Sequence, residues 1–459
     1  MTGADRERGG GEPEDRTVDG DATGGERGAD DEEATHVVTV FLRNDGAVLL
    51  LRRSDEVGTY AGCWGAVSGY AEGDPDAAAR WEIDEETGLE DAVTFVRSGD
   101  PFTFVDDSVD TRWTVHPYLF DCERRDVDSN RESTETAWVP PTEIRRRETV
   151  PRLWTSYDRV RPTVETVEAD SEHGSAYVSV RALEVLRDEA GLRAFPTAAE
   201  TDGDRERGDE WAALVAVAER LRDARPSMTA LANRVNRAMS RAASDRTAEA
   251  VERAARGGIA DALAADREAA AAATDLVADR RVLTLSRSGT VADVLATAPS
   301  SVVVAESRPA NEGVDVAEAL AGEGVDVTLV TDAAVAHVLA EGDVDAVVVG
   351  ADTVLADGSV VNKTGTRGAA IAAANEGVPT YVVTAVDKVT PAAAVELETG
   401  SAAAVYGGDA DVSVENPTFD RTPAAFVTGV VTERGVLDAV GDVAAELERL
   451  ADWPSVTDD

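Results

Sequence analysis

Short apolar runs begin near residue 36 and alternate along the chain with stretches of helical periodicity. HVVTVFLR and AVLLLRR flank Asn44-Asp45-Gly46, and a turn signal between two such runs predicts a β-hairpin. The other elements expected in this region are a helix over 75–87 closed by Gly88, strands over 92–97, 102–105 and 112–121, and a short helix over 141–147. The pattern predicts an α/β domain over 35–151.

The middle of the chain carries apolar positions at helical spacing, as in AYVSVRALEVLRDEAG at 176–191. An acidic, glycine-containing segment at 197–208 interrupts this region. The sequence Arg225-Pro226-Ser227-Met228 separates two helices, because proline disfavours helix in the residue before it. We therefore expect a helical subdomain over 157–280.

The last part of the chain returns to short apolar strands. The expected strands are RVLTLS, SVVVAES, VDVTLVT, VDAVVVG and PTYVVT, with helical runs such as 317–321 and 333–339 between them. Strands that alternate with helices in this way predict a parallel, doubly wound, Rossmann-like sheet, here over 281–450. The fold class predicted for the whole chain is α/β.

Composition adds a strongly acidic surface to this picture. The 459 residues include 89 Asp and Glu against 44 Lys and Arg, a formal charge of -45. Such a field argues against nonspecific nucleic-acid binding and against affinity for anionic membranes, and it is typical of a halophile, in which salt screens the self-repulsion. Only Cys63 and Cys122 occur and no apolar run is long enough to span a bilayer, so we expect a soluble cytoplasmic protein. Residues 1–34 are expected to form a disordered acidic tail.

The helix expected at 75–87 carries three glutamates on one face. Glu82, Glu85 and Glu86 lie at positions i, i+3 and i+4, so their side chains project to the same side. Like charges at this spacing repel one another, and a hard divalent cation would relieve the repulsion. In so acidic a chain, the alternative is a solvated helix face without a metal.

The run AARWEIDEETGLE, after Gly69 and a polar loop, resembles the signature of Nudix hydrolases, and the resemblance extends over about residues 36–150. It implies an α/β/α sandwich that hydrolyses a nucleoside diphosphate derivative. In that family the signature glutamates hold Mg²⁺ or Mn²⁺, which here assigns the metal to Glu82, Glu85 and Glu86.

Two features depart from the Nudix pattern. Trp81 stands where the family places arginine, and Arg80 lies one residue earlier, which turns it about 100° around the helix. The loop after Gly69 is about two residues short, which leaves Glu72 or Asp74 to replace its glutamate.

The stretch 343–366 combines a buried strand, a turn and a polar helix start. The strand over 346–349 places Asp352 at its carboxyl end, where open α/β sheets bind their ligands. After an Asp-Gly turn, Asn362 and Lys363 introduce an Ala-rich helix whose free N–H groups would attract a phosphate. Lysine occurs in the chain only at positions 363 and 388, which makes both ammonium groups candidates for phosphate contacts.

Two further strand ends carry groups suited to an anion. Ser286, Ser288 and Gly289 follow one expected strand and open a helix. Arg308 follows the next strand and could hold a phosphate through two hydrogen bonds, while Asp352 could move a proton on a sugar carbon or hydroxyl. The expected ligand is a sugar phosphate or a nucleotide.

These segments, taken in order, resemble the alpha, beta and delta subunits of translation initiation factor 2B. They also resemble ribose-1,5-bisphosphate isomerase and methylthioribose-1-phosphate isomerase, over about residues 175–448. The resembling segments are 284–288, 306–309, 350–352, 362–366 and 416–423. The resemblance implies a homodimer or higher homo-oligomer formed through the sheet domain.

Ser286 occupies the position at which those isomerases carry a catalytic cysteine. A hydroxyl titrates far above a thiol and is a poor substitute for it in proton transfer. Three interpretations of this domain therefore remain open: ligand binding without turnover, isomerisation that depends on Asp352, and loops that only shape a dimer. For the whole chain, the main hypothesis is a hydrolase domain joined to a phosphometabolite sensor, and the alternative is a non-catalytic regulator of translation initiation.

Overall fold

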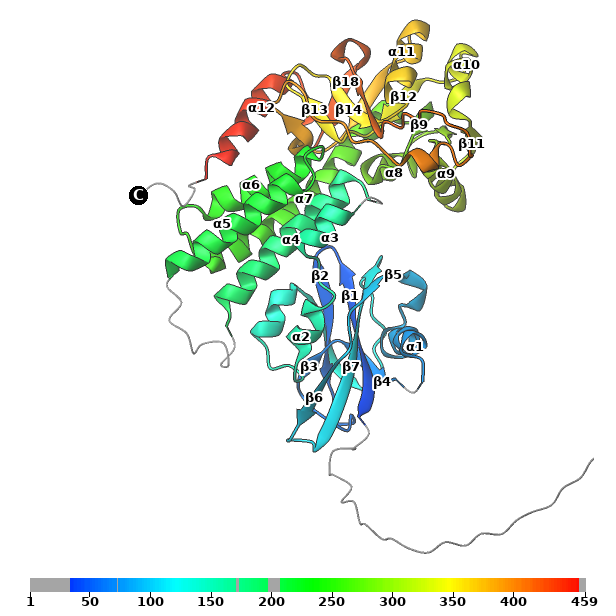
Figure 1. The fold of residues 1–459 in the computed structure, drawn as a ribbon. Coiled ribbons are helices and arrows are strands. Elements are labelled where there is room, and N and C mark those ends of the chain that lie inside the picture. The colour runs from blue at the N-terminus through cyan, green and yellow to red at the C-terminus, as the bar shows by residue number, and fades with distance from the viewer. Residues whose placement is uncertain (1–33, 72, 171–172, 197–206, 454–459) are drawn as a thin grey trace, which may run out of the picture.

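The computed structural model describes residues 34–453 except 72, 171–172 and 197–206. The expected acidic tail, except its last residue, and most of the expected acidic linker lie outside the described residues. Figure 1 shows three parts in chain order: a mixed-sheet domain, a group of packed helices, and a second sheet domain with helices on both of its faces. Among the described helices, none is long and apolar enough to cross a membrane.

The first domain is built around a mixed sheet with the order β3-β2-β1-β7-β5, and β4, β6 and β8 join it at β1, β7 and β2. Its strands are β1 (Thr35–Asn44), β2 (Ala47–Arg53), β3 (Trp64–Gly65), β4 (Val67–Tyr70), β5 (Val93–Ser98), β6 (Phe102–Asp106), β7 (Thr111–Cys122) and β8 (Ser133–Val139). The expected hairpin is confirmed: β1 and β2 are antiparallel and joined by Asp45 and Gly46, both at positive φ. The other expected strands of this domain are confirmed as β5, β6 and β7.

Helices cover both faces of this sheet. On one face lies α1 (Pro75–Thr87), which has the predicted bounds and ends, as predicted, at Gly88, here in the left-handed conformation. Its N-cap is Asp74. Its buried residues pack with Val38 and Val40 of β1, whereas Phe41, which points the other way, packs with α2 (Leu153–Asp158). The short helix expected over 141–147 is a 3₁₀ turn, η2 (Pro141–Arg145). The result is the α/β/α sandwich expected from the signature.

The middle part consists of packed helices with one core of their own. They are α3 (Val164–Ala169), α4 (Ser175–Ala194), α5 (Arg207–Ala224), α6 (Thr229–Ala242) and α7 (Ala248–Val277). The break expected at residues 225–228 separates α5 from α6. The long helix α7 also packs against the second sheet, so it belongs to two cores.

The second sheet has the order β11-β10-β9-β12-β15-β18-β19 and is parallel except for β19. Its strands are β9 (Arg281–Leu285), β10 (Ser301–Ala305), β11 (Val327–Val330), β12 (Ala346–Val349), β15 (Thr380–Val383), β18 (Gly429–Thr432) and β19 (Gly435–Val436). One face is covered by α7, α8 (Gly289–Leu295) and α9 (Glu312–Gly322), and the other by α10 (Val335–Ala340), α11 (Thr366–Glu376) and α12 (Val440–Glu448). The doubly wound sheet is confirmed, and its strand order reverses between β9 and β12.

A smaller four-stranded sheet lies beside the second one and differs from the sequence expectation. It has the order β16-β13-β14-β17, formed by β13 (Thr353–Leu355), β14 (Val360–Lys363), β16 (Val389–Thr390) and β17 (Phe419–Thr422). The Asp-Gly turn at 357–358 therefore closes a hairpin, because apolar residues flank it on both sides. Lys363 ends a strand, and the following helix begins only at Thr366.

The first domain meets the helices through buried charged and polar groups. Arg43 at the end of β1 forms ion pairs with Asp121 of β7 (2.7 Å) and with Glu184 of α4 (3.3 Å). Its guanidinium also donates to the hydroxyl of Tyr177 on α4 (2.9 Å). From α4, Arg187 donates to the carbonyl of Gly46 in the β1–β2 turn (2.5 Å). These contacts bind the turn and strand ends of the sheet to one side of α4.

Candidate functional site

The first cavity, of about 400 Å³, opens on one face of the N-terminal sheet. Neighbouring strands place alternate residues on the same face, and the pairs Val37↔Tyr70, Val37↔Val115 and Phe104↔Trp113 fix the register. The floor is formed by side chains of this face, namely Val37, Thr39, Ser68, Tyr70, Phe104, Trp113 and Val115. Leu153 and Ser156 of α2 lie on the wall.

The glutamates of α1 reach the same cavity from the other side of the sheet. Glu82 and Glu85 line it, whereas Glu86 is buried outside the lining and accepts a hydrogen bond from the backbone N–H of Ser68 (3.4 Å). The carboxylate of Glu82 lies so close to Gly69 that a Cβ there would be 1.6 Å from its Oε1. Glycine at this position therefore lets the helix bring a carboxylate against β4.

The electrostatics of this cluster are those of crowded carboxylates. Burial, and after it the charges of Glu85 and Glu132, raise the pKa of Glu82 to about 7. Burial and the charge of Glu82 raise the pKa of Glu86 well above its usual value. Oxygen ligands that repel one another in this way suit a hard divalent cation, so the residues fit the metal of a Nudix site. Among the described residues, no group of three His, Cys, Asp or Glu side chains is already arranged around a metal position.

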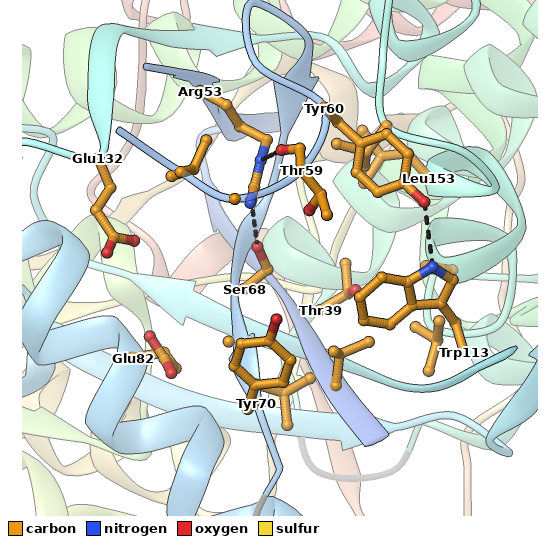
Figure 2. Close-up of a pocket in the computed structure, with 18 of the residues that line it drawn as sticks. Thr39, Arg53, Thr59, Tyr60, Ser68, Tyr70, Glu82, Trp113, Glu132 and Leu153 are labelled. Atoms are coloured by element: carbon orange, nitrogen blue, oxygen red, sulfur yellow. Dashed lines mark hydrogen bonds between the residues drawn. The ribbon is translucent and has the colours of Figure 1, made fainter. Parts of the chain in front are cut away.

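Glu132 and Arg53 also line this cavity, and neither was found from the sequence. Glu132 lies just before β8, and Figure 2 shows its carboxylate on the same side of the cavity as that of Glu82. Arg53, at the end of β2, donates to the carbonyl of Thr59 (3.0 Å) and to the hydroxyl of Ser68 (3.4 Å). Neither belongs to the signature, and only the tertiary fold brings them to α1.

The residues that depart from the Nudix pattern differ in whether they line the cavity. Trp81 is 60 % exposed and lines the cavity mouth, whereas the guanidinium of Arg80 lies over the ring of Phe120 (5.6 Å). Asp74 accepts the backbone N–H of Asp76 as the helix cap. Glu72 lies outside the described residues.

The second cavity, of about 310 Å³, lies where the order of the second sheet reverses. It is lined by most of the predicted residues of this domain: Ser286, Ser288, Gly289, Asp352, Asn362 and Lys363. Ser286 follows β9 and Asp352 follows β12, so the site forms at the carboxyl ends of the two strands that flank the reversal. Arg308 is exposed and does not line this cavity.

An acidic residue not found from the sequence occupies the middle of this site. Glu312, the first residue of α9, accepts a hydrogen bond from the Ser286 hydroxyl (2.7 Å) and forms an ion pair with Lys363 (3.0 Å). Its local signal is weak, because an acidic first turn is common at helix starts. The groups expected to meet an anion are therefore partly neutralised by this carboxylate.

Lys388 supplies the second ammonium group of this cavity. Burial lowers its pKa, while Asp352 acts in the opposite direction, and its Nζ donates to the carbonyl of Ala351 (2.6 Å). Burial raises the pKa of Asp352, an effect opposed first by Lys388 and then by Lys363. Both lysines of the chain thus flank the carboxyl group at the end of β12.

The start of α4 closes the cavity from the helical part. Ser175 and Tyr177 line it together with His173 and Gly174. Tyr177 is the residue whose hydroxyl accepts a hydrogen bond from Arg43 of the first domain. One helix therefore contributes to the second cavity and contacts the first domain.

Comparison with known families divides the chain into two parts, each of which includes one of the two cavities. The NUDIX domain model matches residues 33–160, and the model of the Initiation factor 2 subunit family matches residues 171–439. A Nudix domain generally uses a divalent cation, in agreement with the donor groups found here.

Curated relatives match somewhat less than a third of the chain. The methylthioribose-1-phosphate isomerase of Albidiferax ferrireducens is 40 % identical over 148 residues, which cover 30 % of this chain and 42 % of the relative. The ribose 1,5-bisphosphate isomerase of Haloferax volcanii is 44 % identical over 142 residues, which cover 29 % of this chain and 43 % of the relative. The chain thus spans less than half the length of these relatives.

Solved structures share the fold of a larger part of the chain. The translation initiation factor eIF-2B of Pyrococcus horikoshii OT3 superposes with a TM-score of 0.51 at 24 % identity, covering 60 % of this chain and 94 % of that one. The 5-methylthioribose 1-phosphate isomerase of the same organism superposes with a TM-score of 0.50 at 22 % identity. The match covers 69 % of this chain and 90 % of that one. With more than half of its length matched by the family model, the chain belongs to the Initiation factor 2 subunit family and carries a NUDIX domain ahead of the family domain.

Proposed function

We propose that the NUDIX domain is a divalent-metal hydrolase of a nucleoside diphosphate derivative. The observation that carries the proposal is the cluster of Glu82, Glu86 and Glu132 beside a cavity lined by Arg53, in which burial and then the neighbouring carboxylates raise the pKa values of Glu82 and Glu86. Glu82, Glu85 and Glu86 would hold the cation, Mg²⁺ or Mn²⁺. The bound cation would supply charge neutralisation of the diphosphate and a more acidic water.

The protein's own groups would orient the substrate. Arg53 faces the cavity from the end of β2 and would pair with a phosphate oxygen, since a guanidinium donates two parallel hydrogen bonds. Glu132 is exposed beside Glu82 and would accept a proton from the attacking water. Gly69 has no side chain, which leaves room for the carboxylate of Glu82 against β4.

The test is phosphate release from a panel of nucleoside diphosphate derivatives with Mg²⁺. We expect Glu85→Gln and Glu86→Gln to lower kcat by at least about a hundredfold, in the range typical for loss of a group that acts on the transition state. Asp84→Asn is the matched control, because Asp84 is an exposed residue of the same helix outside the cavity. Equal rates in the wild type and the two glutamine variants would exclude this assignment.

For the second domain we propose binding of a sugar phosphate or nucleotide without turnover, in a cytoplasmic homo-oligomer. The supporting observation is that the Ser286 hydroxyl, which stands in for the thiol of the isomerases, is bound to Glu312. Lys363 and Lys388 would provide the charge for a phosphate. The alternative from the same residues is isomerisation through Asp352.

A thermal-shift titration with ribose 1,5-bisphosphate and with AMP tests the second site. We expect a ligand-dependent rise in Tm that Lys363→Ala abolishes, because the ammonium group lines the cavity. Arg308→Ala is expected to keep the shift, since Arg308 lies outside the lining. Ketose formation that Asp352→Asn removes would instead establish the isomerase.

A further inference from the structure

The start of α4 takes part in two parts of the molecule at once. In Figure 1 the packed helices lie between the two sheet domains. Gly174, Ser175 and Tyr177 line the second cavity. The hydroxyl of Tyr177 also reaches the NUDIX domain, so one side chain contacts both the cavity and the neighbouring domain. Ligand binding in the second domain accounts only for the cavity side of this residue.

The hydroxyl of Tyr177 is held by an ion pair of the NUDIX domain. It accepts a hydrogen bond from the guanidinium of Arg43 (2.9 Å) and donates one to the carboxylate of Asp121 (3.1 Å). Arg43 and Asp121 are themselves joined by two hydrogen bonds (2.7 and 3.0 Å), so both contacts on the hydroxyl come from one fixed unit. Burial raises the pKa of Tyr177, so the hydroxyl stays protonated and can donate to Asp121.

The ring of Tyr177 is fixed on its cavity side as well. The imidazole of His173, another lining residue, stacks on it with ring centroids 4.1 Å apart and an angle of 17° between the planes. The guanidinium of Arg181 lies over the same ring, 4.7 Å from its centroid. His173 is in turn hydrogen-bonded to the carboxylate of Asp170 (3.0 Å). A displacement of the phenol ring would therefore disturb the imidazole that forms part of the cavity wall.

We propose that Arg43 and Asp121 of the NUDIX domain are positioning residues of the second cavity, whose affinity for a ligand they raise by holding Tyr177. This inference rests on the ligand binding proposed above for the second domain, and it adds the neighbouring domain as the part that completes the site. A wall whose rings are held before a ligand arrives loses less conformational freedom on binding, whereas a released ring must be ordered at a cost in affinity. Because linked equilibria are reciprocal, a ligand in this cavity also stabilises the contact between the NUDIX domain and α4.

Calorimetric Kd values of the full chain for ribose 1,5-bisphosphate and for AMP test the inference. Tyr177→Phe keeps the ring and removes only the hydroxyl, and we expect it to raise Kd about three- to tenfold, the range that one hydrogen bond supplies. Asp121→Ala removes the acceptor of that hydroxyl and should raise Kd in the same range, while Arg43 keeps its ion pair with Glu184 (3.3 Å). Added to Tyr177→Phe, Asp121→Ala should raise Kd no further, because its effect passes through the missing hydroxyl.

A second tyrosine separates positioning of the cavity wall from general loosening of the interface. The hydroxyl of Tyr157 also joins the NUDIX domain to α4, by donating to Asp188 (2.9 Å), but Tyr157 lies outside the lining of the second cavity. We expect Tyr157→Phe to lower Tm and to leave Kd unchanged. A Kd raised equally by Tyr157→Phe and Tyr177→Phe would overturn the inference. An effect of Asp121→Ala that is as large in Tyr177→Phe as in the wild type would also overturn it.

Failure of this inference and failure of the second site give different results. Probe binding that Lys363→Ala abolishes, with a wild-type Kd in Tyr177→Phe and in Asp121→Ala, would retain the site and reject the role of the NUDIX domain. A wild-type chain that binds neither probe would reject the second-site function and this inference with it. Kd values that rise in both single variants, and no further in the double variant, would support the inference.

Discussion

At the scale of single residues, the carboxyl groups of α1 link the metal to the stability of the NUDIX domain. The pKa of Glu82 is raised to about 7 from 4.5, and that of Glu86 is also raised. Between pH 4.5 and about pH 7, the folded state therefore binds more protons than the unfolded state. The metal-free protein loses stability as the pH rises through this range. Ionised carboxylates bind the cation, so metal binding opposes this loss.

The corresponding prediction concerns Tm with EDTA at about pH 5 and at about pH 8. We expect Tm of the wild type to fall more between these two pH values than Tm of Glu82→Gln, which has no charge to bury. Addition of Mg²⁺ at the higher pH should raise Tm of the wild type and have a smaller effect on Glu82→Gln. Asp84→Asn serves as the control with a wild-type profile. Parallel profiles for the wild type and Glu82→Gln would contradict this account.

At the scale of elements, local sequence signals predicted a helix or strand correctly where its periodicity and both of its ends lie in one short stretch of sequence. The helix α1 was predicted to the residue, because the helical run begins at Pro75 and Gly88 ends it. The hairpin and the alternating strands of the second sheet were found in the same way. The hairpin of β13 and β14 was missed although its Asp-Gly turn lies between apolar residues. Its extension into a small sheet has no local signal, because β16 and β17 follow much later in the sequence.

The same distinction applies to the candidate sites. Local spacing indicates that Glu82 and Glu86 share a helix face, but it contains no information on Arg53 or Glu132, which only the folded sheet places beside them. In the second cavity, the rarity of lysine in the sequence indicated Lys388, whereas Glu312 had no distinguishing signal. Residues that act together across separate elements require the tertiary structure for their assignment.

At the scale of the whole molecule, buried charges join the NUDIX domain to the helices. Arg43 is 3 % exposed and Glu184 is fully buried, so the loss of one partner leaves the other buried without compensation. We expect Arg43→Met to lower the free energy of unfolding by about 3–5 kcal/mol, as measured by urea denaturation.

Arg52 offers a matched comparison, because it pairs with Glu135 at 2.7 Å while both side chains are about half exposed. Arg52→Met should cost no more than about 1 kcal/mol, since exposed pairs contribute little. Equal costs for the two substitutions would show that the buried network does not hold the parts together.

The two lysines have a practical consequence for the study of ligands. Apart from the histidines, every other basic side chain is an arginine, so the side-chain amines of the molecule both line one cavity. A reagent that acylates primary amines would modify only these two side chains and the amino terminus. The rate of acylation at Lys363 would then report directly whether a compound occupies the cavity, without a probe having to be engineered into the protein.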